Sequence, residues 1–162
     1  MQRRTGLMLI TAILAACAST PPLNIQDIDA SITPPTAVTD IDSARGKKIM
    51  WGGIIIDSRN LEKRTRLEIL AYPLDDRQRP RLDREPFGRF IAEYDGYLET
   101  VDYAAGRSLS LTGTLHGITE GSIDNAVYTY PTITVDQVHL WPTPQHDKEP
   151  HFQIGIGVYM HN

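Results

Sequence analysis

The stretch Arg107–Ile118, RSLSLTGTLHGI, decides the fold class of this chain. Its apolar positions, Leu109, Leu111, Gly113 and Leu115, alternate with serine, threonine and histidine residues. Successive side chains of a β-strand point to opposite faces of a sheet, so this period of two predicts a strand with one buried face. A helix would instead space its apolar residues three and four positions apart.

Similar patterns lie on both sides of this stretch. Runs rich in β-branched and aromatic residues, bounded by Gly and Pro, favour strands, and a Gly52-Gly53 pair inside the first run is typical of a bulge or sharp bend. One short helix is predicted at Tyr97–Ala104, YLETVDYA. The further candidate strands are Lys47–Ile56, Arg66–Tyr72, Gly88–Glu93, Thr132–Trp141 and Phe152–Met160.

These elements predict a mainly all-β fold. Several short strands separated by turns favour closure, because closing the sheet removes its exposed edges. We therefore expect a small closed or partly open OB-like β-barrel of five to six antiparallel strands with one short helix.

Length and composition limit the class of protein. The 162 residues correspond to about one domain. The chain is 41% apolar and 22% charged, a composition typical of folded rather than disordered proteins. The net charge of -4 makes a polybasic nucleic-acid binder an unlikely class, so no nucleic-acid partner is expected. The single cysteine excludes a disulfide framework and a cysteine-rich zinc site.

The first seventeen residues have the organisation of a secretory signal. Arg3 and Arg4 precede a short apolar run, Leu7–Ile13, which is too short to span a bilayer. The next four residues are Leu14, Ala15, Ala16 and Cys17. Bulky Leu14 fits the ordinary A-x-A cleavage pattern poorly. The four residues instead resemble a lipobox, the signal of bacterial lipoproteins, and the alternative is a free thiol after an ordinary apolar run.

A lipobox has consequences for where the protein resides. Leu14, Ala15 and Ala16 would be recognised by the signal peptidase, residues 1–16 would be removed, and Cys17 would carry covalent lipid. Two or more acyl chains anchor a protein stably, whereas one gives only reversible binding. The residue after the cysteine is Ala18 rather than Asp, and in this the chain resembles lipoproteins that are transported to the outer membrane. We expect a lipid-anchored outer-membrane protein that faces the periplasm, with the membrane as partner and no cofactor besides the lipid.

The lipidated cysteine is followed by a stretch of different composition. Residues 17–45 contain the pairs Pro21-Pro22 and Pro34-Pro35, which favour extended backbone and predict a tether. Ile25, Ile28 and Ile32 lie at helical spacing between the proline pairs, which is compatible with one or two helical turns docked on the domain. The folded domain is predicted to cover residues 46–162.

Six segments carry a resemblance to a known family: Trp51–Ile55, Thr65–Asp75, Gly88–Ala92, Gly106–Gly113, Tyr128–Pro131 and His139–Trp141. In these segments, which stand in the family's order, the chain resembles the Slp family of outer-membrane lipoproteins of Gram-negative bacteria. The resemblance covers roughly residues 14–141 and implies induction in starvation or stationary phase, but carries over no catalytic residues.

Catalytic motifs are missing from the sequence, which has no G-x-S-x-G, G-x-x-x-x-G-K-[ST], G-x-G-x-x-G or H-E-x-x-H. The ligand-like cluster near the C-terminus consists of His139, His146, His151, Asp147 and Glu149. The prolines between them predict a loose loop without defined ligand geometry, so no metal site is predicted. We therefore expect no enzyme.

The sequence leaves two main hypotheses for the function, and an enzyme ranks third behind them. The first is a non-enzymatic structural or protective envelope factor under starvation or acid stress. The alternative is an OB-like module that binds an oligosaccharide, a peptide or an envelope protein. Its candidate binding face consists of Trp51, Arg89, Tyr97, Arg107, Tyr128, Tyr130, His139 and Trp141.

Overall fold

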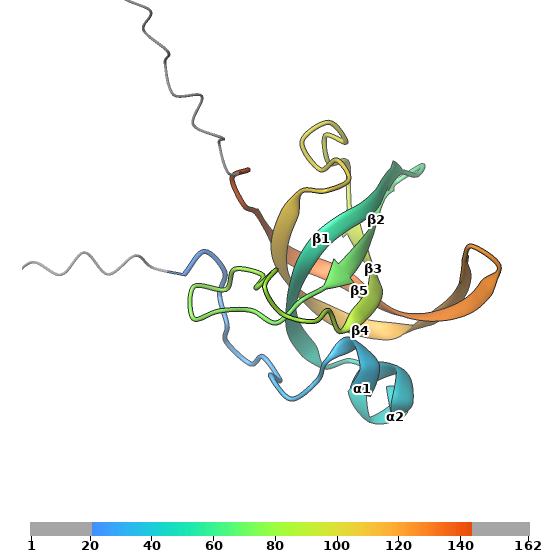
Figure 1. Ribbon diagram of the computed structural model, residues 1–162. Helices are drawn as coiled ribbons and strands as arrows, with labels where there is room; N and C mark the ends of the chain where they lie inside the picture. The colour runs from blue at the N-terminus through green and yellow to red at the C-terminus, as the bar shows by residue number, and fades with distance from the viewer. Residues whose placement is uncertain (1–20, 144–162) are drawn as a thin grey trace, which may run out of the picture.

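The computed structural model describes residues 21–143, which form a closed five-stranded β-barrel (Figure 1). The strand order around the barrel is β1-β2-β3-β5-β4, and β4 pairs back onto β1. This order defines an OB-like barrel. The strands are β1 (Lys48–Asn60), β2 (Arg64–Ala71), β3 (Gly88–Asp95), β4 (Ser108–Ile123) and β5 (Ala126–Leu140).

The expected strands are confirmed with one correction to their direction. Five of the six candidates are present and several are longer than predicted, while Phe152–Met160 lies outside the described residues. Four pairings are antiparallel, but β3 and β5 are parallel, with Ile91 opposite Thr132. A wholly antiparallel barrel was wrong for a simple reason. A closed ring with an odd number of strands must contain at least one parallel pair.

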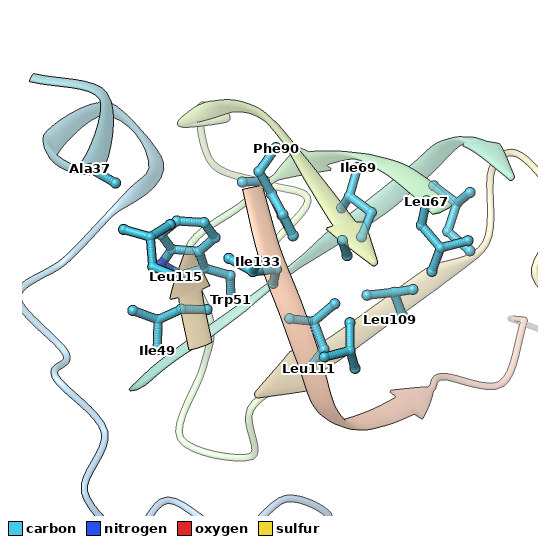
Figure 2. Packing of buried hydrophobic residues seen from close by; sticks show 14 of the residues in the cluster. Ala37, Ile49, Trp51, Leu67, Ile69, Phe90, Leu109, Leu111, Leu115 and Ile133 are labelled. Carbon is cyan, nitrogen blue, oxygen red and sulfur yellow. The ribbon is translucent and has the colours of Figure 1, made fainter. Parts of the chain in front are cut away.

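The barrel interior is filled by side chains from all five strands (Figure 2). Trp51 and Phe90 pack edge to face with ring centroids 5.1 Å apart, a favourable geometry for aromatic pairs. The alternation of the deciding stretch is confirmed on its apolar side. The other interior residues include Ile49, Ile55, Leu67, Ile69, Ala92, Leu109, Leu111, Leu115 and Ile133.

The polar side of that stretch departs from the expectation. Ser110 and Thr112 were predicted to face outward, yet both are buried. The loop between β2 and β3 covers this part of the barrel, and the Ser110 hydroxyl donates a hydrogen bond to the carbonyl of Gln78 in that loop. This loop, whose position strand periodicity cannot reveal, explains the burial of Ser110.

The glycine pair in β1 marks a close approach of strands. Gly53 lies opposite Ala71 of β2 and Leu109 of β4, and a Cβ atom added to it would stand 1.9 Å from the Leu70 carbonyl oxygen. The bulge expected here lies further along the strand, between Ile55 and Asp57. Gly53 is therefore required by the contact with β2.

The described part of the predicted tether packs on the barrel. Two short helices, α1 (Pro34–Thr39) and α2 (Ile41–Ala44), bury Ala37 and Ala44 against the core. The proline pair does not extend the chain, because Pro34 begins α1, where its missing N–H costs nothing. Thr33 and Thr36 form a capping box at that end. Residues 21–45 therefore belong to the folded unit, and in residues 21–143 no helix is long and apolar enough to cross a membrane.

Further toward the N-terminus, Leu23 is held by the loop between β2 and β3. The Gln78 side chain is 4% exposed; its oxygen accepts from the Leu23 N–H at 2.9 Å, and its nitrogen donates to the Leu23 carbonyl at 3.0 Å. Buried backbone groups need such partners.

We therefore expect Gln78→Ala to lower the free energy of unfolding by about 2 kcal/mol, because two buried groups lose their hydrogen bonds. Arg77→Ala, one residue away but exposed, is the matched control and should change it by less than about 0.5 kcal/mol. Urea denaturation measures both. Equal effects of the two substitutions would contradict a stabilising role for the two Gln78–Leu23 hydrogen bonds.

The helix predicted at Tyr97–Ala104 is wrong, and the segment forms turns. The N–H groups of Asp102 and Tyr103 both donate to the Glu99 carbonyl, which makes one turn that does not continue. The N–H of Leu98 instead donates to the Thr65 hydroxyl at 2.8 Å. An eight-residue segment has too few helical hydrogen bonds to resist such anchoring.

Candidate functional site

A polar cleft of about 320 Å³ lies on the outer face of β1 and β2, and residues of the β4–β5 hairpin line one side of the cleft. This volume is at the lower end for small-molecule sites. The loop after β1 contributes Leu61 to it, and the hairpin contributes Gly121 and Ser122. The remaining lining residues are Asp57, Arg59, Arg66, Glu68, Ile91 and Tyr130.

On this face, side chains of like charge lie opposite each other on β1 and β2. The strand register places Asp57 opposite Glu68, and Arg59 opposite Arg66. Like charges directly opposite on a sheet repel, so each needs a counter-charge. Arg59 binds Asp57 at 2.6 Å and Arg89 binds Glu68 at 2.7 Å, which compensates both carboxylates.

Glu68 is the centre of a hydrogen-bonded group that includes two tyrosines. The Tyr130 hydroxyl donates to Glu68 at 3.3 Å, and the Tyr128 hydroxyl accepts from the backbone N–H of Arg89 at 2.8 Å. The hydrogen bond to Glu68 raises the pKa of Arg89, and burial, followed by the nearby Glu68 charge, raises the pKa of Tyr130. Arg89 and Tyr130 therefore keep their protons at neutral pH.

Arg66 is the exception in this set of charges. It lies opposite Glu93 on β3, but the Glu93 carboxylate is bound by Arg64 at 2.6 Å. Among residues 21–143, no carboxylate lies within 4.0 Å of the Arg66 guanidinium. Within residues 21–143, the Arg66 guanidinium thus lacks an ion-pair partner.

The predicted binding face is divided among separate places. Arg89, Tyr128 and Tyr130 come together beside the cleft, and the two tyrosine rings lie 4.6 Å apart. Trp51 is a core residue whose indole nitrogen donates to the Ile32 carbonyl at 2.8 Å. Tyr97 is 65% exposed and contacts the loop after β1.

The remaining three form a second group where β5 ends. His139 and Trp141 pack edge to face with centroids 4.4 Å apart, and Arg107 donates to the Trp141 carbonyl at 3.4 Å. The Trp141 indole nitrogen donates to the Ser110 hydroxyl at 2.9 Å, and the Arg79 guanidinium stacks over its ring at 5.7 Å. These contacts fix the covering loop to the barrel and indicate a structural role.

The sequence interpretation included Tyr130 but missed the charged residues of the cleft. Asp57, Arg59, Arg66 and Glu68 were not singled out, because charged side chains on strands ordinarily face solvent. Their outward alternation on β2 was visible in the sequence. What it could not show was that the β4–β5 hairpin extends beyond the barrel and closes one side of the cleft.

The cleft presents carboxylate, guanidinium and hydroxyl groups, which are able to form hydrogen bonds and ionic contacts. In the part of the chain that the structure describes, no three His, Cys, Asp or Glu side chains gather as a metal site. His146, His151 and the lipobox residues, Leu14, Ala15, Ala16 and Cys17, lie outside that part.

The closed barrel and its outer-face cleft define a small OB-like β-domain. The match of a family model, "Outer membrane lipoprotein Slp family", over residues 14–161 then shows that the chain belongs to this family. The family is one of outer-membrane lipoproteins, so the chain belongs at the outer membrane.

Relatives from two bacteria agree with this assignment. The chain is 32% identical to the uncharacterized lipoprotein YeaY of Escherichia coli (strain K12), over 62% of this chain and 51% of that protein. It is 27% identical to the outer membrane protein Slp of the same strain, over 87% and 76%. An uncharacterized protein of Haemophilus influenzae is 28% identical over 79% and 70%. The chain thus spans about half the length of YeaY and more of the other two.

Solved structures that are similar to this one share little sequence with it. The mitochondrial single-stranded DNA binding protein Rim1 of S. cerevisiae matches with a TM-score of 0.38 and 12% identity, over 59% of this chain and 94% of that one. A small single-stranded DNA-binding protein of Streptomyces coelicolor matches with a TM-score of 0.35 and 17% identity, with the same coverage.

Proposed function

We propose that this chain is a non-enzymatic envelope factor, anchored by lipid on Cys17, that holds its OB-like domain on the periplasmic side of the outer membrane and protects the envelope in starvation or acid stress. The observation that carries the proposal is the family match, which begins at residue 14 and so includes the four lipobox residues.

The packing of the barrel supports a protective rather than a catalytic role. Aliphatic and aromatic side chains fill its interior, whereas an enzyme needs titratable groups that converge on a reacting atom. In the outer-face cleft, each carboxylate is already compensated by an arginine.

A deletion strain of the native host tests this role. We expect the deletion to lower survival in acidified stationary-phase culture, and wild-type protein, but not Cys17→Ser, to restore it. Survival equal to that of the parent strain would reject the protective role, and full restoration by Cys17→Ser would reject the need for the anchor.

The cleft favours a second function, that of a binding module. The β2–β3 face and the loops beside it are where OB-like barrels bind extended ligands, and here the cleft lies next to that face, between the β1–β2 loop and the β4–β5 hairpin. The two functions are compatible, because a tethered module that binds an envelope component would also reinforce the envelope.

A further inference from the structure

We propose that the cleft between the β1–β2 hairpin and the β4–β5 hairpin binds an anionic saccharide, whose carboxylate or phosphate group contacts Arg66. The proposal deepens the binding-module function by naming the site and the class of ligand. It is independent of whether Cys17 carries lipid.

The first step is the charge of the cleft and its surroundings. Two guanidinium groups, of Arg59 and Arg66, line the cleft with two carboxylates, of Asp57 and Glu68. Each carboxylate lies within 2.7 Å of a guanidinium other than that of Arg66. Arg66 also lies opposite Arg59 in the register, and this repulsion is relieved if an anion sits between them. A carboxylate or phosphate can accept two parallel hydrogen bonds from a guanidinium.

The second step is the character of the other lining groups. Asp57 and Glu68 present carboxylate oxygens, and Ser122 presents a hydroxyl, next to the apolar side chains of Leu61 and Ile91. Sugar hydroxyl groups both donate and accept hydrogen bonds, so they can use carboxylates and guanidinium groups side by side. A sugar ring also has apolar C–H faces that pack on aliphatic side chains.

The third step is shape. A cleft of about 320 Å³ admits a group of the size of one or two sugar rings. Its hollow form, with the β4–β5 hairpin along one side, admits a ligand that is small enough to enter it. The backbone of Gly121 lies directly over the Tyr130 ring, where an added Cβ would be 3.0 Å from a ring atom. Tyr130, at 4% exposure, thus forms a fixed floor.

Calorimetric titration of the full chain, purified in a neutral detergent at low salt, tests the site. The probes are trigalacturonic acid, which carries carboxylates, glucose 1-phosphate, which carries a phosphate, and neutral maltotriose. We expect binding of one or both anionic sugars, and at least about tenfold weaker binding of maltotriose. Binding should weaken as salt is added, because the contact is ionic.

Arg66→Gln should weaken binding of the anionic sugar by about tenfold or more, and Arg66→Lys should restore part of it. Arg77→Gln removes the same charge from an exposed loop that does not line the cleft, and should leave binding unchanged. A thermal melt of each variant confirms folding, which an outer-face substitution should not disturb.

Several results would overturn the proposal. These are no heat with either anionic sugar, equal losses with Arg66→Gln and Arg77→Gln, or maltotriose bound as tightly as the charged sugars. Two further probes test other anionic ligands: a triglutamate peptide and vesicles of phosphatidylglycerol. Binding to only one of these probes, and not to the charged sugars, would assign the cleft to another class of ligand. None of these results bears on lipidation, which is tested separately.

Discussion

Gly53→Ala should prevent the barrel from closing, or lower its free energy of unfolding by about 3 kcal/mol or more. The added Cβ would lie 1.9 Å from the Leu70 carbonyl oxygen. That oxygen belongs to the backbone of β2, so it cannot rotate away like the end of a side chain. β1 pairs with β2 on one side and with β4 on the other, so moving it disturbs both neighbours.

Gly117→Ala is the matched control for this substitution. Gly117 also lies in a strand and is buried, but an added Cβ would meet only the end of the Arg45 side chain, at 3.8 Å. We expect a change of less than about 1 kcal/mol there. Circular dichroism and urea denaturation of both variants make the comparison. If Gly53→Ala were as stable as wild type, the close approach of β1 and β2 would be contradicted.

Cys17→Ser should remove the protein from the outer-membrane fraction entirely. Each buried methylene of an acyl chain adds about 0.8 kcal/mol to membrane affinity, and stable anchoring takes two or more chains. A serine hydroxyl cannot form the thioether, so the variant should take up no radiolabelled palmitate. Envelope fractionation and lipid labelling, run side by side, measure both effects.

Ser19→Ala is the control for the loss of the anchor, since it leaves the thiol and the four lipobox residues in place. It should be labelled and fractionate like the wild type. Label that persists in Cys17→Ser would show that the lipid is attached elsewhere in the chain.

The main features of the fold could be predicted because strand periodicity is a local property. Leu109, Leu111 and Leu115 alternate in the sequence and line the interior. The parallel pairing of β3 with β5 depends on the number of strands that close the ring, which a single strand does not encode. The burial of Ser110 likewise depends on a loop that precedes it by more than twenty residues.

One predicted helix and one predicted extended segment were wrong, for opposite reasons. A short helix was predicted around Tyr103, yet backbone N–H groups donate to the Thr65 hydroxyl and to the Glu99 carbonyl and hold the segment in turns. Pro34 and Pro35 looked extended, yet a capped helix begins at Pro34. The spacing of Thr33 and Thr36 was the local signal that could have identified that cap.

Less of the candidate site than of the fold could be predicted. Arg89, Tyr128 and Tyr130 were singled out as aromatic or arginine residues and do come together. Trp51 was included for the same reason and lies in the core. Arg66 was missed, because its distinction is the lack of a carboxylate partner within the described residues, and pairing across strands depends on register.

The most direct test of the lipid anchor is the intact mass of the protein purified from its own envelope. We predict a chain that begins at Cys17 and is heavier than the 146 residues alone by the mass of three acyl chains and a glycerol group. Tandem mass spectrometry should place that addition on the first residue. A chain that retains residues 1–16 and carries an unmodified thiol at Cys17 would contradict the anchor and, with it, the proposed role.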